Sequence, residues 1–151
     1  MADLSTWYNQ GLYLMSIGTI DFDTTDSIRM CLCTKAYTPS AADDDECSDL
    51  TVTTATNYTN KALASANITV SENADGSVYF DYTDSIVWTS LGNGTNESIR
   101  YAVVYFNDGA STNDGKLLAC LDFGSGTIKS TNGSDFKVTI NASGIGKIAT
   151  S

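Results

Sequence analysis

The amino-acid sequence predicts an all-β protein, a jelly-roll-like antiparallel β-sandwich with a short helix or arm at its N-terminus. Runs rich in β-branched and aromatic residues recur roughly every 8 to 15 residues, and clusters of Gly, Asn, Asp and Ser separate them. Charged residues make up only 17% of the chain, which contains a single proline. This composition is typical of a strand-and-turn protein and not of a helical bundle or a disordered tail.

The length of 151 residues corresponds to one domain. We expect it to span residues 1–151, with an N-terminal arm or helix over 1–15 and the β-sandwich over 27–145. In the N-terminal segment the apolar residues are spaced as on one face of a helix: Leu4, Trp7, Tyr8, Leu12 and Met15. Asp3 or Ser5 is available as the helix N-cap, whereas Gly11 lowers the helix propensity.

A half-buried strand is predicted next, because residues 27–34 alternate in character. One face carries Ile28, Met30 and Leu32, and the other carries Arg29, Cys31 and Cys33. Residues 37–49 then combine the only proline of the chain with an acidic run over 43–49. We expect this segment to be a long solvated loop, and such loops often carry contacts to other molecules.

The remaining strands are predicted from β-branched and aromatic runs bounded by turn residues. They cover residues 50–54, 62–71, 77–83, 86–90, 99–106, 117–123 and 136–140. Residues 99–106 and 117–123 are apolar on both faces, so we expect these two strands in the interior of a sheet.

The charge of the chain argues against nucleic acid as a partner. Eight basic and eighteen acidic side chains give a formal charge of −10, whereas DNA-binding proteins neutralise phosphates with Lys and Arg. No segment approaches the roughly 20 apolar residues of a membrane-spanning helix, and the N-terminus lacks the basic start of a secretory signal. We therefore expect no nucleic acid, no membrane and synthesis in the cytoplasm. The acidity suits a solvated outer surface or a partner with a basic face.

Catalytic chemistry is disfavoured by the residue types present. The chain contains no histidine, which excludes Ser-His-Asp and Cys-His arrangements within it. A paired-carboxylate hydrolase is the alternative, because Asp81, Asp84 and Asp122 lie on or beside predicted strands. Turn chemistry at strand ends explains these positions better. We therefore expect no enzymatic activity.

Metal binding is disfavoured as well. The cysteines lack the C-x2-C spacing of a zinc site: they are Cys31, Cys33, Cys47 and Cys120. We expect buried or half-buried free thiols, with a late cross-link through Cys47 as the alternative. Asp21, Asp23 and Asp26 are spaced like the start of a calcium loop, but the Gly and Glu that such a loop needs later are missing. No metal ion or other cofactor is expected.

Aromatic residues suggest one alternative function, the binding of carbohydrate by ring stacking. The residues concerned are Trp7, Tyr8, Tyr13, Tyr37, Tyr58, Tyr79, Tyr82, Trp88, Tyr101 and Tyr105. Most of them alternate with aliphatic residues inside predicted strands, which favours positions in the core or at an oligomer interface.

Five motifs, in their order and spacing, resemble a known family. They cover residues 21–33, 79–88, 100–109, 117–124 and 135–145. Residues 7–145 are in this respect similar to the capsid decoration, or cement, proteins of tailed bacteriophages. The resemblance implies a virion structural protein, assembled in the host cytoplasm, that sits as a homotrimer on the outer surface of the head. There it would bind the major capsid protein and clamp adjacent copies, stabilising the expanded capsid. The alternative is a phage tail or appendage module that binds host-surface carbohydrate.

Two segments are candidates for the capsid contact, the N-terminal arm and the acidic loop. The residues concerned are Asp3, Leu4, Trp7 and Tyr8 in the arm, and Pro39, Asp43, Asp44 and Asp45 in the loop. If the arm lies outside the sheet, deleting residues 1–8 should weaken binding and leave the β-fold intact. The alternative is that Trp7 and Tyr8 cap the sandwich core.

Overall fold

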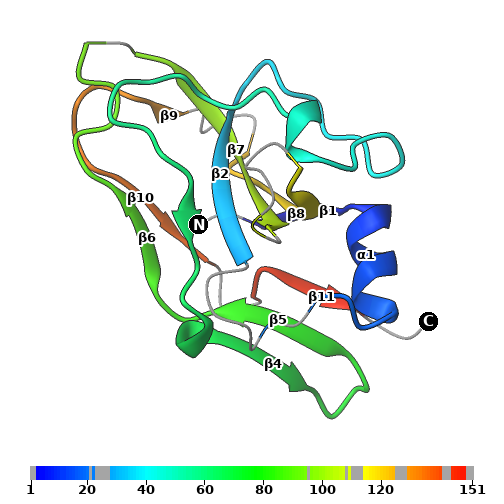
Figure 1. The fold of residues 1–151 in the computed structure, drawn as a ribbon. Helices are drawn as coiled ribbons and strands as arrows, with labels where there is room; N and C mark the ends of the chain where they lie inside the picture. Colours follow the sequence, from blue (N-terminus) through cyan, green and yellow to red (C-terminus); the bar gives the residue numbers. More distant parts are fainter. Residues whose placement is uncertain are drawn as a thin grey trace.

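In its computed structural model the chain forms antiparallel β-sheets with a short α-helix near the N-terminus (Figure 1). The structure describes residues 3–20, 22, 28–94, 96–107, 109, 114–124, 129–140 and 144–148. The predicted all-β sandwich with a short N-terminal helix is confirmed over these residues.

The larger sheet has six strands among the described residues, in the order β1-β8-β7-β2-β3, with β9 also pairing with β7. These strands are β1 (Asp3–Trp7), β2 (Ile28–Thr34), β3 (Lys61–Ala62), β7 (Ser98–Phe106), β8 (Lys116–Asp122) and β9 (Lys129–Ser130). The long strand β7 pairs along its length with β2 on one side and β8 on the other. Residues 101–105 and 117–121 are buried without interruption, as expected for strands in a sheet interior.

Two smaller sheets form the opposing layer. One has the order β11-β5-β4 and the other consists of β10 and β6. Their strands are β4 (Ile68–Glu72), β5 (Val78–Tyr82), β6 (Ser85–Trp88), β10 (Phe136–Thr139) and β11 (Gly146–Ile148). The main core lies between the layers, and we call the face of the larger sheet that lines it the inner face. It joins Met30, Leu32, Ala102, Val104 and Leu121 to Phe80, Tyr82, Ile86, Trp88 and Val138.

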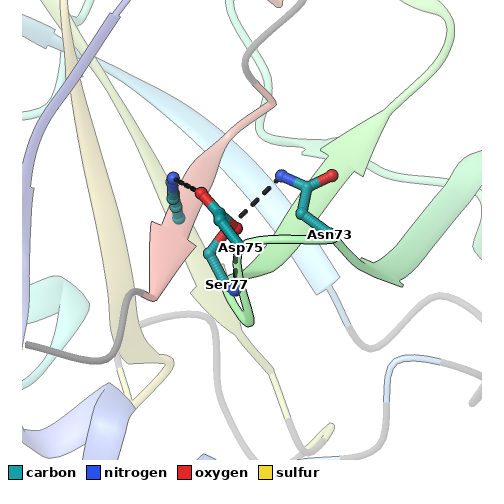
Figure 2. A network of polar contacts seen from close by, with 4 residues as sticks. Asn73, Asp75 and Ser77 are labelled. Atoms are coloured by element: carbon teal, nitrogen blue, oxygen red, sulfur yellow. Dashed lines mark hydrogen bonds and ion pairs between the residues drawn. The ribbon is translucent and has the colours of Figure 1, made fainter.

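The turn between β4 and β5 is fastened to β11 by polar side chains (Figure 2). Asp75 accepts the Ser77 backbone N–H at 2.9 Å, and Asn73 donates to the Ser77 hydroxyl at 3.3 Å. The other carboxylate oxygen of Asp75 binds the ammonium group of Lys147 in β11 at 2.8 Å. These hydrogen bonds, first that of Lys147 and then those of Ser77, lower the pKa of Asp75. The turn therefore ties the three strands of this small sheet together.

The predicted N-terminal helix is partly wrong, because its first residues form a strand. Residues 3–7 are β1, which pairs with β8 and places Leu4 opposite Leu121. The helix α1 begins only at Asn9 and ends at Ser16. The apolar spacing fits a helix, but pairing with the free edge of β8 satisfies the backbone groups of residues 3–7 and overrides this weak local preference. Residues 1–8 therefore include an edge strand of the sheet, and their deletion is not expected to leave the fold intact.

Gly11 has a packing role in α1 that its low helix propensity does not reveal. A Cβ atom at this position would collide with the backbone of Leu117 and Leu118 in β8. The absence of a side chain thus lets the helix lie directly on the larger sheet, where Tyr8 donates its backbone N–H to the Leu118 carbonyl at 3.0 Å.

The second face of the larger sheet, here the outer face, is also buried. It carries Cys31, Cys33, Tyr101, Val103, Tyr105, Leu117 and Cys120. The covering layer is irregular chain from residues 37–58, which contributes Tyr37, Cys47, Leu50, Val52 and Tyr58. The prediction that β2 is half-buried is therefore wrong, because the face opposite the main core has its own cover.

Other strand predictions need smaller corrections. Residues 50–54 form only an isolated bridge, between Val52 and Cys33. The predicted strand 62–71 is divided into β3, a 3-10 turn over Ser65–Asn67, and β4. The final alternating strand is β10, and β11 lies beyond the predicted end of the sandwich at residue 145.

Candidate interaction surface

The structure brings together the two segments that the sequence singles out for contacts. Tyr8 directly follows β1 and is fully buried, and its hydroxyl lies 2.6 Å from the hydroxyl of Tyr37. The backbone N–H of Asn9 donates to the carbonyl of Ala41 at 2.9 Å. The start of α1 and the segment 37–49 thus form one continuous surface region, at the right of Figure 1.

A chain of three hydrogen-bonding groups holds this junction. Tyr37 donates its hydroxyl proton to Asp44 at 2.6 Å, so the bond between the two tyrosines must be donated by Tyr8. The same oxygen of Asp44 accepts the backbone N–H of Ser40 at 2.8 Å. Burial raises the pKa of both Tyr8 and Tyr37. Both hydroxyls therefore keep the protons that these hydrogen bonds require.

The acidic segment 37–49 is an ordered layer, which corrects the expectation of a solvated loop. Its backbone is joined to the sheet, because Cys47 donates its N–H to Gly115 at 2.9 Å and Leu117 donates to Asp45 at 3.0 Å. Glu46 forms an ion pair with Lys116 at the start of β8. The cause is the apolar outer face, which this chain segment and its continuation to residue 58 cover together with Tyr8.

Three carboxylates of this segment are exposed to solvent. Asp43, Asp45 and Asp49 are exposed, whereas Asp44 is half-buried in its bond with Tyr37. Asp49 also accepts the N–H groups of residues 45 and 46, both at 3.0 Å, which fixes the backbone beneath the charges. The exposed part of the acidic run is therefore a preorganised negative surface, bordered by the half-buried Pro39.

The N-terminal candidates have mainly structural positions. Asp3 and Leu4 lie on β1, at the outermost position of the larger sheet. Trp7 packs on Gly146 and donates its indole N–H to the Lys147 carbonyl at 3.3 Å, which joins β1 to β11. Tyr8 has no exposed surface, so its assignment as a contact residue is wrong. The alternative, that Trp7 and Tyr8 cap the sandwich core, describes Trp7, which packs against the main core, whereas Tyr8 is buried in the cluster of the outer face.

The burial of the aromatic side chains shows whether they serve packing or are available for stacking on a ligand. Tyr8, Tyr37, Tyr82, Trp88, Tyr101 and Tyr105 are buried, and Trp7, Tyr58 and Tyr79 are half-buried. Tyr13 on α1 is the one ring of this set that is exposed, at 57%. The prediction that these aromatics belong mainly to packing is confirmed, and a stacking platform made from them is not formed.

The three carboxylates considered for hydrolysis occupy turn and strand-end positions. Each accepts a nearby backbone N–H: Asp81 that of Tyr82 at 2.7 Å, Asp84 that of Ser85 at 2.7 Å, and Asp122 that of Gly124 at 2.8 Å. Asp122 also binds the guanidinium of Arg100 at 3.0 Å. These contacts agree with the local role in turns that the sequence favours for them.

The four cysteines lie together on the outer face and its cover. Cys31, Cys33 and Cys120 are buried there, half-buried Cys47 packs against them, and all four are free thiols, as predicted. A hydrogen bond with Cys33, together with burial, raises the pKa of Cys31, and burial raises the pKa of Cys120 to about 12. Within the described ranges no group of Cys, Asp or Glu side chains is arranged to hold a metal ion. Asp21, Asp23 and Asp26 lie outside the described residues.

Two features of the structure do not follow from the sequence pattern. The sequence pattern identifies Tyr37 only as an aromatic ring, and nothing in the spacing shows that it links Tyr8 to Asp44. A hollow beside β9 and β10, lined by Lys129 and Lys137 among others, was not predicted at all.

No helix in the described part of the chain is long and apolar enough to cross a membrane. Comparison with protein-family models, curated proteins and solved structures found no match.

Proposed function

We propose that this protein is a capsid decoration protein of a tailed bacteriophage. It binds the exterior of the head and clamps adjacent major capsid proteins, so that the expanded capsid resists rupture. The proposal is supported by the resemblance in motif order over residues 7–145 and by a β-sandwich with an ordered acidic surface. It acts by binding, as a homotrimer assembled in the host cytoplasm and carried on the outer surface of the virion.

The observation that carries the proposal is the preorganised acidic segment. Asp43 and Asp45 are exposed on a backbone that Asp44 and Asp49 hold in place. Because the segment is already ordered, little conformational entropy is lost when a partner binds it. Its charge favours a partner with a basic face and opposes contact with the packaged genome.

Many weak contacts suffice for this function. A closed trimer presents the same acidic surface several times, and each further contact on the shell forms at a high effective concentration. A modest interface for each protomer can therefore hold neighbouring capsid proteins against the outward pressure of the DNA.

The test is the occupancy of expanded heads by charge variants. Asp43→Asn with Asp45→Asn removes two exposed charges and keeps the hydrogen bond that the Ser40 hydroxyl donates to residue 43 at 2.6 Å. We expect occupancy to fall at least about fivefold at low ionic strength and heads to release DNA at a lower temperature. Asp84→Asn, on the other layer, is the matched control and should bind like the wild type.

Two results would contradict the proposal. Wild-type protein that does not bind expanded heads would exclude the decoration function. Binding that is equal in the double variant and the control would exclude the acidic segment as the contact.

A further inference from the structure

A hollow of about 610 Å³ lies beside the strands β9 and β10, away from the acidic segment. It is lined by residues from 129 to 139 and by Phe123, which follows the end of β8. In Figure 1 β9 and β10 are at the left, whereas the acidic segment is at the right. The hollow is therefore separate from the acidic segment, and a ligand bound there does not depend on the decoration function.

The charge of the hollow is opposite to that of the chain. Lys129 and Lys137 line it, and both are exposed, whereas Asp135 is the one carboxylate in the lining. Asp135 already accepts the backbone N–H of Ser90 at 3.0 Å. The ion pairs formed among the described residues involve Arg100, Lys116 and Lys147 and leave both lysines of the hollow available. In a protein of charge −10 the two lysines therefore make the hollow locally basic.

Aromatic rings and hydrogen-bonding groups complete the lining. Phe123 and Phe136 meet edge to face, with 6.0 Å between their ring centroids, and both are only partly buried. Asn132 uses its carbonyl oxygen to accept the N–H of Ser134 at 3.1 Å, which leaves its amide N–H groups as donors. Ser130 and Thr139 add hydroxyl groups.

The free edge of β10 supplies further polar groups. Among the described strands β10 pairs with β6 alone, so backbone N–H and C=O groups on its other side have no strand partner. Four consecutive residues of the hollow, 136–139, belong to this strand. A ligand lying along it meets donors and acceptors at regular intervals.

We infer that this hollow binds a short acidic saccharide, one that carries a carboxylate or phosphate on an oligosaccharide of a few rings. The volume lies within the range of about 300–1000 Å³ that is usual for small-ligand sites. Phenylalanine rings suit the apolar C–H faces of sugars, the hydroxyl and amide groups suit their hydroxyls, and the two ammonium groups suit the anion. An acidic peptide would use the lysines and the strand edge but not this combination of rings and amide donors.

Matched pairs of probes test the inference. 3′-Sialyllactose and lactose differ by one carboxylated sugar, trigalacturonate and maltotriose form a second pair, and hexaglutamate tests an acidic peptide. Titration is followed by the amide resonances of the full-length protein. We expect both acidic saccharides to shift resonances of residues 129–139 and to bind at least about fivefold more tightly than their neutral partners.

Charge variants locate the binding. Lys129→Gln with Lys137→Gln should weaken binding of the acidic saccharides about fivefold, since two exposed charge contacts are lost. Lys35→Gln with Lys61→Gln removes the same charge elsewhere and should bind like the wild type.

Three results would overturn the inference. The first is the absence of binding by both acidic saccharides, and the second is equal binding of acidic and neutral sugars. The third is hexaglutamate binding as tightly as the saccharides, which would reassign the hollow to an acidic peptide.

Discussion

The two faces of the larger sheet are buried by different means. On the inner face aliphatic and aromatic side chains of β2, β7 and β8 pack against strands of the opposing layer. On the outer face the cover is irregular chain, and hydroxyl groups join it to the sheet. Tyr58 accepts the backbone N–H of Leu32 at 2.9 Å and donates to Asn60 at 2.6 Å, and Asn60 donates to Tyr105 at 2.8 Å.

The difference has a physical cause. Strands satisfy one another's backbone groups, so the inner face can be filled by packing alone. Irregular chain cannot do so, and its buried polar groups need side-chain partners. Tyr8, Tyr37 and Asp44 provide such partners at the other end of the cover. The free energy of unfolding should therefore depend mainly on side-chain volume at the inner face and on side-chain hydrogen bonds at the outer face.

The largest effect is expected from a cavity at the inner face. Leu121 in β8 is fully buried in the main core. Leu121→Ala should lower the free energy of unfolding by about 2–5 kcal/mol, because it removes apolar contacts and leaves a void. Chemical denaturation followed by circular dichroism measures this. A loss below about 1 kcal/mol would show that the inner face is less tightly packed than described.

A smaller effect is expected at the outer face, from the loss of a hydroxyl. Tyr37→Phe keeps the ring but leaves Tyr8 and Asp44 without their shared partner, which should cost about 1–3 kcal/mol. Tyr101→Phe is the matched control. This ring is also buried, but its hydroxyl makes no hydrogen bond among the described residues, so we expect a change within about 0.5 kcal/mol. Equal losses in the two variants would contradict the role of the hydrogen-bonded chain.

The same tyrosine hydroxyls should make the stability of the protein fall at alkaline pH. Burial raises the pKa of Tyr8 and Tyr37 above the ordinary value of about 10. As the pH rises above about 10, the unfolded chain releases these protons first, so stability is complete below that pH and falls above it. The fall should be less steep in Tyr37→Phe, as measured by denaturation between neutral and alkaline pH.

The smallest effect is expected where polar contacts are exposed. Asp75 is paired with Lys147 at the turn between β4 and β5, and water competes with this pair. Asp75→Asn should lower the melting temperature only slightly at neutral pH. Because Lys147 and Ser77 lower the pKa of Asp75, the difference should shrink as the pH falls below about 4. If Asp75→Asn lowered the melting temperature as much as Tyr37→Phe does, the number of hydrogen bonds lost would determine stability more than the solvent exposure of the site.

Local sequence patterns predict those strands that can be recognised from their own apolar residues, without knowledge of residues far away in the sequence. Residues 99–106 and 117–123 are apolar on both faces and are β7 and β8, and the alternation at Ile28, Met30 and Leu32 correctly placed the inner face of β2. The outer face was not predicted, since its cover is a hydrophilic segment whose few apolar residues follow no period. Strand β1 was taken for a helix because its partner, β8, is more than a hundred residues away.

The sequence predicts which two segments form the candidate surface, but it does not predict that they contact each other. Both segments were singled out, yet their junction depends on Tyr8 and Tyr37, which are 29 residues apart and meet only in the folded chain. The lysines of the hollow were overlooked for the same reason. Lys129 and Lys137 lie on two strands that are not paired with each other, and no sequence spacing brings them to one site.

The raised pKa values of Cys31, Cys47 and Cys120 make the oxidation of these three thiols slow. A thiol reacts with oxidants as its thiolate, and a buried thiol with a raised pKa forms very little of it. The hydrogen bond between Cys31 and Cys33, together with burial, suppresses the thiolate of Cys31, and burial does so for Cys47 and Cys120. A change from a reducing to an oxidising medium should therefore leave these three thiols in their free form for longer than exposed thiols.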